Sequence, residues 1–241
     1  MRTRFLGALQ FLTVVPVPGK TASPGESAIF FPLAGALLGA SSGALCLAFA
    51  NGLGWPLSAL LALAWLIAIT GCLHEDGLAD VADAVRAGRP REKIMAILKD
   101  SRIGAYGALA LIVTVAMRWQ ALAQINVNAA LGMTAAVALS RTSLVALAGI
   151  SPAAGEGLGV DFARCCSRSL VLFTAAQAVV IALLVDLRYG TAMILASALI
   201  VLLARAYFMR RLGGVNGDCL GATCLAVETT NMVILAWHRF S

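Results

Sequence analysis

Three aspartates follow one another at helical spacing in the segment 74-HEDGLADVADAV-85. Asp76, Asp80 and Asp83 are separated by four and three residues, so an α-helix stacks their carboxylates on one face. Like charges in that arrangement repel each other, and a cation is needed to compensate them. Mg²⁺ is the natural candidate, because it binds carboxylates, keeps water ligands and bridges substrate phosphates.

The alternative is a solvated helix in a loop, which would mix acids with bases and long polar residues on every face. The positions between the three aspartates are instead Gly, Leu, Ala and Val. A helix that is apolar apart from one acidic stripe is typical of a lined cavity in a membrane protein, where ionisable groups serve function. The sequence therefore favours a metal site, with the solvated helix as the alternative.

Basic and small residues gather in a second segment, 99-KDSRIGAYG-107. Lys99, Ser101 and Arg102 stand just before a glycine-rich helix start, and the amino terminus of a helix favours anions. Arginine is also suited to bidentate phosphate contacts. A positive anchor at a membrane boundary is the alternative for these bases.

A third segment, 213-GGVNGDCLGATCLAVE-228, has Asp218 at the start of an apolar helix and Glu228 close to the same face, ten residues later. Its glycines suit the approach of a phosphate to the backbone. The alternative for Asp218 is an N-cap, and the alternative for Glu228 is an ion pair with Arg141. Together, the three segments hold the carboxylates and anion-binding groups that Mg²⁺-dependent phosphoryl transfer requires.

The amino-acid composition indicates which class of protein holds these residues. Of the 241 residues, 60% are hydrophobic and 12% are charged, whereas a soluble domain carries roughly 25% charged residues. A soluble enzyme and a disordered chain are both excluded, and a polytopic membrane protein remains. The net charge of +6 indicates membrane orientation and anionic lipid, and no nucleic acid partner is expected.

We expect an all-α polytopic membrane protein with about seven transmembrane helices, because a span needs about 20 apolar residues. The short segment NGLG would join the first two spans as a hairpin, and the stretch GALLGASSGA suits close helix packing. Residues 1–18 are expected to form an interfacial or re-entrant helix. One membrane-embedded catalytic domain would cover 1–241, with its acidic helix in 74–102. The predicted spans are 28–50, 55–73, 103–125, 129–150, 170–187, 189–206 and 219–237.

The distribution of basic residues predicts the orientation of these spans. Alternating seven spans places most of the 18 Lys and Arg residues on the side that holds the amino terminus and 74–102. Cytoplasmic loops carry such an excess. We therefore expect a protein of the cytoplasmic (inner) membrane whose candidate site faces the cytoplasm.

These segments resemble the cobalamin synthase family of adenosylcobinamide-GDP ribazoletransferases along nearly the whole chain. The pair LHEDGLADVAD and KDSRIGAYG is the most specific part of the resemblance. The sequence departs from the family pattern where Val14, instead of Arg, follows Thr13, and where Asn216 replaces Thr. The other matching segments are ALQFLTVVPVP at the start, FFPLAGALLG at 30–39, ILKDSRIGAYG at 97–107, Ser140–Arg141 and GGVNGDCLGA at 213–222.

The resemblance implies an integral membrane enzyme that uses Mg²⁺ to join α-ribazole, or its 5′-phosphate, to adenosylcobinamide-GDP with release of GMP. It implies that Asp76, Asp80 and Asp83 hold the metal and the pyrophosphate. Asp83, Asp218 and Glu228 are the catalytic candidates, because a carboxylate close to the attacking oxygen can act as a base. The residues expected to bind substrate are His74, Glu75, Lys99, Ser101, Arg102, Arg141, Asn216 and Gly217. The sequence leaves a homo-oligomer open.

Three other functions are weighed against this one. A phosphotransferase of CDP-alcohol type would need Ala-Arg soon after Asp-Gly, whereas Asp76-Gly77 is followed by Leu-Ala-Asp. A membrane prenyltransferase would bring two Asp-rich motifs, and one is present. A non-catalytic corrinoid carrier would use Arg141 and Glu228 as coupling residues, but inverted repeats and paired broken helices are not evident.

Overall fold

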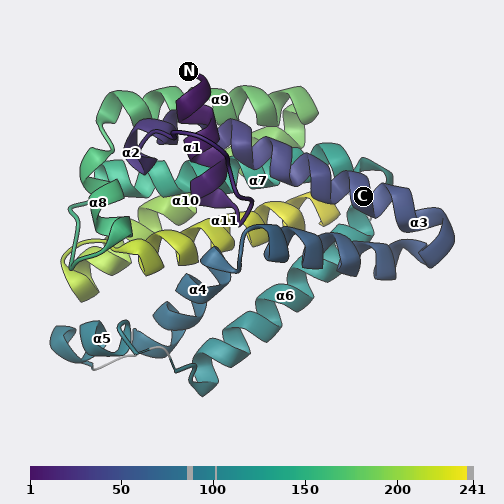
Figure 1. Cartoon of the computed structure of the whole chain (residues 1–241). Coiled ribbons are helices and arrows are strands. Elements are labelled where there is room, and N and C mark those ends of the chain that lie inside the picture. Colours follow the sequence, from purple (N-terminus) through teal and green to yellow (C-terminus); the bar gives the residue numbers. More distant parts are fainter. Residues whose placement is uncertain (86–88, 101, 238–241) are drawn as a thin grey trace.

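The computed structural model describes residues 1–85, 89–100 and 102–237, and within these ranges the chain is a bundle of helices (Figure 1). One isolated parallel bridge joins Ala153 to Val215. The all-α class expected from the sequence is confirmed. The elements are α1 (Arg2–Leu12), α2 (Pro24–Ser27), the 3-10 turn η1 (Ala28–Phe30), α3 (Phe31–Ile69), α4 (Leu73–Ala84), α5 (Arg91–Ile97), α6 (Ala105–Ile125), the 3-10 turn η2 (Asn126–Asn128), α7 (Ala129–Ile150), α8 (Leu158–Cys165), α9 (Arg168–Val185), α10 (Leu187–Leu212) and α11 (Gly217–Ala236).

Six helical segments in the described part of the chain are long and apolar enough to cross a membrane, which confirms a polytopic architecture. The first, Pro24–Ile69, contains both of the first two predicted spans. It turns back at Gly54, whose φ of 74° lies outside the helical region. The two arms then pack side by side: Ser42 Oγ donates to the Ala62 carbonyl at 2.8 Å, and Trp65 Nε1 donates to Ser41 Oγ at 3.2 Å. The predicted hairpin is therefore confirmed.

Helices α7 and α11 form the centre of the bundle. In their apolar windows 78% and 72% of the residues are buried, against 22%, 17% and 22% in α6, α9 and α10. The outer helices instead present large apolar side chains, such as Ile112 of α6 and Leu184 of α9, to their surroundings. Such surfaces are costly in water and favourable in lipid. The arrangement therefore suits a bilayer around the outer helices.

The close approach that the Gly-rich stretch predicts occurs between the first arm of α3 and α7. Gly35, Gly39 and Gly43 lie four residues apart and face the backbone of α7. A Cβ at Gly35 would lie 2.6 Å from the Val137 carbonyl oxygen, and a Cβ at Gly39 would collide with the Met133 carbonyl. Small residues at this spacing let two helix backbones touch.

Replacing Gly39 with Ala is therefore expected to lower the free energy of unfolding by about 1–3 kcal/mol, because the methyl group forces α3 away from α7. The matched control is Gly52→Ala, since a Cβ at Gly52 meets no atom within 4 Å. Unfolding in detergent with increasing denaturant measures both variants. Equal stability of the two would contradict the close packing of α3 on α7.

The amino-terminal helix α1 has 11 residues, too few to cross the bilayer. It packs on the bundle through Phe11, which stacks on Phe31 at a centroid distance of 5.5 Å. The chain after α1 is held by a hydrogen bond from the Val14 amide to the Ile69 carbonyl at 2.9 Å. The interfacial or re-entrant placement of residues 1–18 stays a prediction.

Helix α4 starts at a sharp turn after α3. Gly71 and Cys72 both have positive φ, 62° and 58°, which redirects the chain before Leu73. Helix α4 then runs away from the bundle towards α5, beside the first turns of α6 (Figure 1). Its acidic residues are thus presented at one end of the bundle.

Candidate functional site

Two helices meet through glycines at the centre of the candidate site. A Cβ at Gly77 of α4 would lie 3.0 Å from the Asp218 carbonyl oxygen and 3.1 Å from its Cα. A Cβ at Gly221 of α11 would lie 3.5 Å from the Cα of His74. This backbone contact brings Asp76 and Asp80 of α4 close to Asp218 of α11. The helix expected at 74–85 is thus packed on a neighbour, and a free solvated helix is ruled out.

The side chain of Asp218 is positioned by the start of α11. Asn216 is the N-cap: its Oδ1 accepts from the Cys219 amide at 3.0 Å, and its Nδ2 donates to Asp218 Oδ2 at 2.9 Å. The alternative that Asp218 serves as the N-cap is therefore wrong. The amide of Asn216 both caps the helix and holds the carboxylate beside α4. Binding of substrate by Asn216 and Gly217 stays a prediction.

The aspartates affect each other's ionisation. Burial raises the pKa of Asp80 to about 6, and the charges of Asp76, Asp218 and Asp83 act in the same direction. The ion pairs between residues that the structure describes involve other acids. The like charges expected from the sequence are therefore close together and lack a protein cation in an ion pair.

The donor set can be tested against Mg²⁺. Asp76, Asp80 and Asp218 supply carboxylate oxygens, the ligands that this ion prefers. Within the described ranges, no three His, Cys, Asp or Glu side chains are grouped tightly enough to hold a metal by themselves. Protein-bound Mg²⁺ often uses one or two carboxylates, and water and substrate phosphates complete its octahedron. The residues present therefore fit a Mg²⁺ ion that binds together with a phosphate.

The raised pKa of Asp80 predicts how metal binding depends on pH. Because its folded pKa of about 6 lies above the ordinary value of 3.8, folding without metal becomes less favourable as pH rises from about 4 to 6. A cation binds the deprotonated form, so Mg²⁺ should raise the melting temperature more at pH 7.5 than at pH 5. Asp80→Asn should remove most of that difference. An equal Mg²⁺ effect at both pH values would contradict the role of Asp80.

Asp83 has a different environment from the other two aspartates of α4. Its Oδ2 accepts from the Gly104 amide at 2.6 Å and its Oδ1 accepts from the Gly107 amide at 3.0 Å. A Cβ at either glycine would collide with this carboxylate. Asp83 thus caps the amino terminus of α6 from another helix, and it links the two most specific sequence segments. Its metal-binding and catalytic roles stay predictions.

Four buried charges lie beneath the start of α4. Arg118 of α6 donates to Glu75 Oε1 at 2.7 Å and also to Glu228, and Arg141 of α7 donates to the other oxygen of Glu228. Ser140 Oγ contacts the same carboxylate at 3.3 Å. The structure therefore shows the alternative considered for Glu228, an ion pair with Arg141, and the two acids balance the two arginines.

This network separates Glu228 from the aspartates. Glu228 lies ten residues beyond Asp218 on α11, which is about 15 Å along a helix axis, and it is fully buried. Its proposed catalytic role stays a prediction. Arg118 was not predicted as a partner of Glu228, although a charged residue within an apolar run was a signal for it.

The basic residues expected to bind anions are less closely tied to the site. Lys99 is exposed, and the Arg102 side chain is 87% exposed. The Arg102 guanidinium forms a bidentate pair with Asp100, with Nη2 2.6 Å from Oδ2, which lowers the pKa of Asp100 to about 2. Ser101 lies outside the described residues. Among the described residues, the Arg102 side chain is therefore paired with Asp100 instead of with an aspartate of the site. Anion binding by Lys99 and Arg102 stays a prediction.

Two cavities border Asp76. The first has a volume of about 360 Å³ and lies between α1, α4, α8 and α11; Asp76, Asp218 and His74 are among its lining residues. The second has a volume of about 320 Å³ and is lined from the end of α3, α4 and α6, with Asp76, Asp80 and Glu75 among its lining residues. Asp76 is thus accessible to ligands in either cavity.

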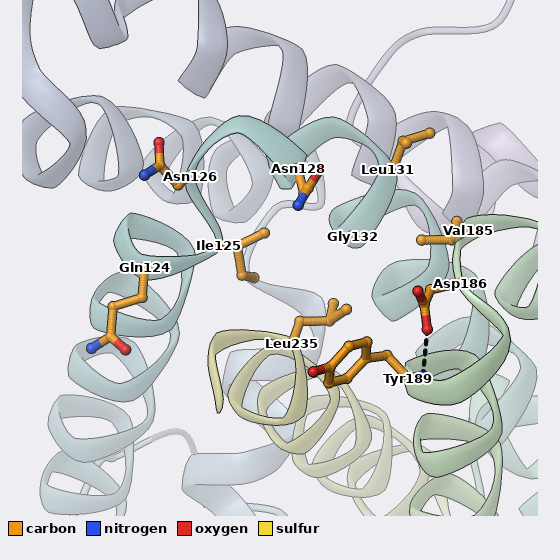
Figure 2. Close-up of a pocket in the computed structure, with 10 residues that line it drawn as sticks. All are labelled: Gln124, Ile125, Asn126, Asn128, Leu131, Gly132, Val185, Asp186, Tyr189 and Leu235. Carbon is orange, nitrogen blue, oxygen red and sulfur yellow. Dashed lines mark hydrogen bonds between the residues drawn. The ribbon is translucent and has the colours of Figure 1, made fainter. Parts of the chain in front are cut away.

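A further cavity, of about 460 Å³, lies at the other end of the bundle (Figure 2). Its lining includes Leu235 near the end of α11, about 25 Å along that helix from Asp218. Asp186 in its wall caps α10 by accepting from the Tyr189 amide at 2.6 Å. This cavity is too far away to share a ligand with the aspartates, and it is not part of the candidate site.

Comparisons with known proteins cover nearly the whole chain. Residues 4–236 match the family described as cobalamin-5-phosphate synthase. Proteins named adenosylcobinamide-GDP ribazoletransferase from Rhizobium johnstonii and Chlorobaculum tepidum are 37% and 36% identical to the chain, with 95% and 98% of it and 94% and 96% of their own lengths covered. One from Escherichia coli O45:K1 is 32% identical, with 98% of both chains covered. No solved structure shows significant similarity. The chain therefore belongs to the cobalamin-5-phosphate synthase family.

Proposed function

We propose that this chain is a Mg²⁺-dependent membrane transferase that joins α-ribazole, or its 5′-phosphate, to adenosylcobinamide-GDP and releases GMP. The observation that carries the proposal is the group of aspartates on α4 and α11, which lies between two cavities. The names of its relatives supply the two substrates. Asp76 borders both cavities, so two substrates bound in them would meet at this residue.

Different residues would bind the metal and position the reacting groups. Asp76 and Asp80 would hold Mg²⁺, which neutralises charge on the pyrophosphate when it is bound. Asn216 fixes the orientation of Asp218, and Asp83 fixes α4 against the first turn of α6. The chain thus acts mainly by positioning groups, which is the main contribution of a protein to phosphoryl transfer.

The bond changes balance without another reactant. A ribose hydroxyl of the acceptor forms a bond to the β-phosphorus of the GDP group, and the bond from that phosphorus to the oxygen of GMP breaks. The hydroxyl proton passes to a carboxylate. Asp218 is assigned this role because it lines the first cavity beside Asp76.

The site is assigned to the cytoplasmic face of the cytoplasmic membrane. The support is the excess of Lys and Arg on the side of the chain that holds the aspartates. Cys165, at the end of α8, is a free and exposed thiol on this side. A membrane-impermeant maleimide should therefore label Cys165 in inverted vesicles and not in right-side-out ones.

The direct test uses the purified full-length protein in liposomes with adenosylcobinamide-GDP, α-ribazole and Mg²⁺. GMP release with formation of the joined corrinoid, abolished by EDTA and restored by added Mg²⁺, is expected. Absence of GMP release in folded protein supplied with Mg²⁺ would overturn the proposal. Binding of the corrinoid without GMP release would favour a carrier, and release of CMP from a CDP-alcohol would favour the other phosphotransferase class.

A further inference from the structure

The first cavity has one acidic end and one aromatic wall. Asp76 and Asp218 line it at the contact of α4 with α11, and Phe11 of α1 and Phe162 of α8 line it elsewhere. Leu144 of α7 also borders it. The remainder of its lining is mostly apolar. Ligand cavities commonly combine such a lining with a few polar groups that fix orientation.

The aromatic wall is built from three nearly parallel rings. Phe31 and Phe162 are 5.4 Å apart at an interplanar angle of 6°, and Phe11 and Phe162 are 5.8 Å apart at 19°. Phe31 is fully buried and Phe162 is 3% exposed, whereas Phe11 is half-buried. Offset parallel rings attract further flat rings, because the edge of one ring faces the electron-rich face of the next. The wall is therefore suited to a planar aromatic group.

His74 is buried, with a relative exposure of 2%, and it is among the residues that line the first cavity. Its Nε2 atom is itself buried and forms no hydrogen bond with any described residue. The expected contact of His74 with substrate stays a prediction.

The starts of two helices also meet at this cavity. A Cβ at Gly159 of α8 would collide with the backbone of Gly217 in α11, so these two amino termini touch. Both glycines line the first cavity together with Asp218. Amino-terminal backbone amides attract phosphate oxygens. The acidic end of the cavity is thus suited to phosphate and its counterion, and the aromatic wall to a neutral ring.

We propose that the first cavity binds the acceptor substrate as a benzimidazole-type nucleoside, with its flat base against Phe11 and Phe162 and its ribose directed to Asp76 and Asp218. This assignment rests on the proposed function. The cavity of about 360 Å³ is within the size range of small-molecule sites.

The second cavity is consistent with this division. The first and second cavities have different linings apart from Asp76, which borders both. An acceptor in the first cavity therefore leaves the second free for the donor substrate, and the two substrates need not compete for one pocket.

The test compares one bulky substitution in each cavity. Leu158 lines the first cavity and is 75% exposed, and Ile103 lines the second and is 58% exposed. Because both side chains are at the surface, Leu158→Trp and Ile103→Trp should both fold. Leu158→Trp is expected to raise the KM for α-ribazole at least about tenfold, with the KM for adenosylcobinamide-GDP within about twofold of wild type. Ile103→Trp should leave the KM for α-ribazole within about twofold.

The outcomes separate this assignment from the proposed function. Wild-type GMP release, with the KM for α-ribazole raised by Ile103→Trp and not by Leu158→Trp, would overturn the assignment and leave the reaction standing. A KM for α-ribazole that neither substitution changes would also overturn the assignment. That result is expected if a lipid chain, and not the acceptor, fills the first cavity. Failure of the wild type to release GMP would instead contradict the reaction.

Discussion

Asp80→Asn is expected to give a folded protein that has lost at least about 100-fold in transfer activity at saturating Mg²⁺. The substitution keeps the size of the side chain and removes one negative charge from the group formed with Asp76 and Asp218. Folding should survive, and even improve slightly without metal, because Asp80 is the carboxylate whose pKa burial and the neighbouring acids raise to about 6. The rate of GMP release from adenosylcobinamide-GDP measures the loss.

The matched control for this variant is Asp186→Asn at the opposite end of the bundle. Asp186 caps α10 by accepting from the Tyr189 amide, and Asn is an equally good N-cap. This control should therefore keep both stability and activity. Wild-type turnover in Asp80→Asn at saturating Mg²⁺ would contradict the metal-binding role of the acidic stripe.

Glu228→Ala is expected to lower the free energy of unfolding by about 3–5 kcal/mol, because it leaves buried arginine charge without its partner. Glu228 accepts from both Arg118 and Arg141. After its removal, Arg118 keeps Glu75, whereas Arg141 keeps only Ser140 as a hydrogen-bond partner among the described residues. Denaturant unfolding in detergent micelles measures the change.

The double variant Arg141→Ala/Glu228→Ala should recover much of that loss. It removes one acid and one base together and leaves the pair of Arg118 with Glu75 intact. The control is Asp161→Ala, which breaks an exposed pair with Arg164 and should change stability by less than about 1 kcal/mol. A double variant as unstable as Glu228→Ala would show that Arg141 has another role, such as direct contact with substrate.

The helices and the acidic stripe follow from local patterns in the sequence. Apolar runs long enough to cross the bilayer predicted the spans, and the glycines at 35, 39 and 43 predicted a close helix contact. The hairpin at Gly54 was also predictable. The six helical segments differ from the seven predicted spans because the first two spans form one helical segment bent at this glycine.

The partners of individual side chains depend on contacts between distant segments, and the sequence did not specify them. Asp83 lies at helical spacing from Asp80, yet its carboxylate accepts hydrogen bonds from the first turn of α6. Asn216, rather than Asp218, caps α11, because the cap depends on where the helix begins. The pair of Arg118 with Glu75 joins residues 43 positions apart, which no local pattern reveals.

The buried charges have a consequence for the order in which the protein assembles. Arg118 and Arg141 lie in α6 and α7, whereas Glu228 lies in α11, which is synthesised after both. An arginine at the centre of a membrane helix costs about 2.5–3.5 kcal/mol on insertion scales. Helices α6 and α7 therefore enter the bilayer before their shared counterion exists. Insertion of α11 completes the charge balance, so nascent chains that stop before Glu228 should be the preferred substrates of membrane quality-control proteases.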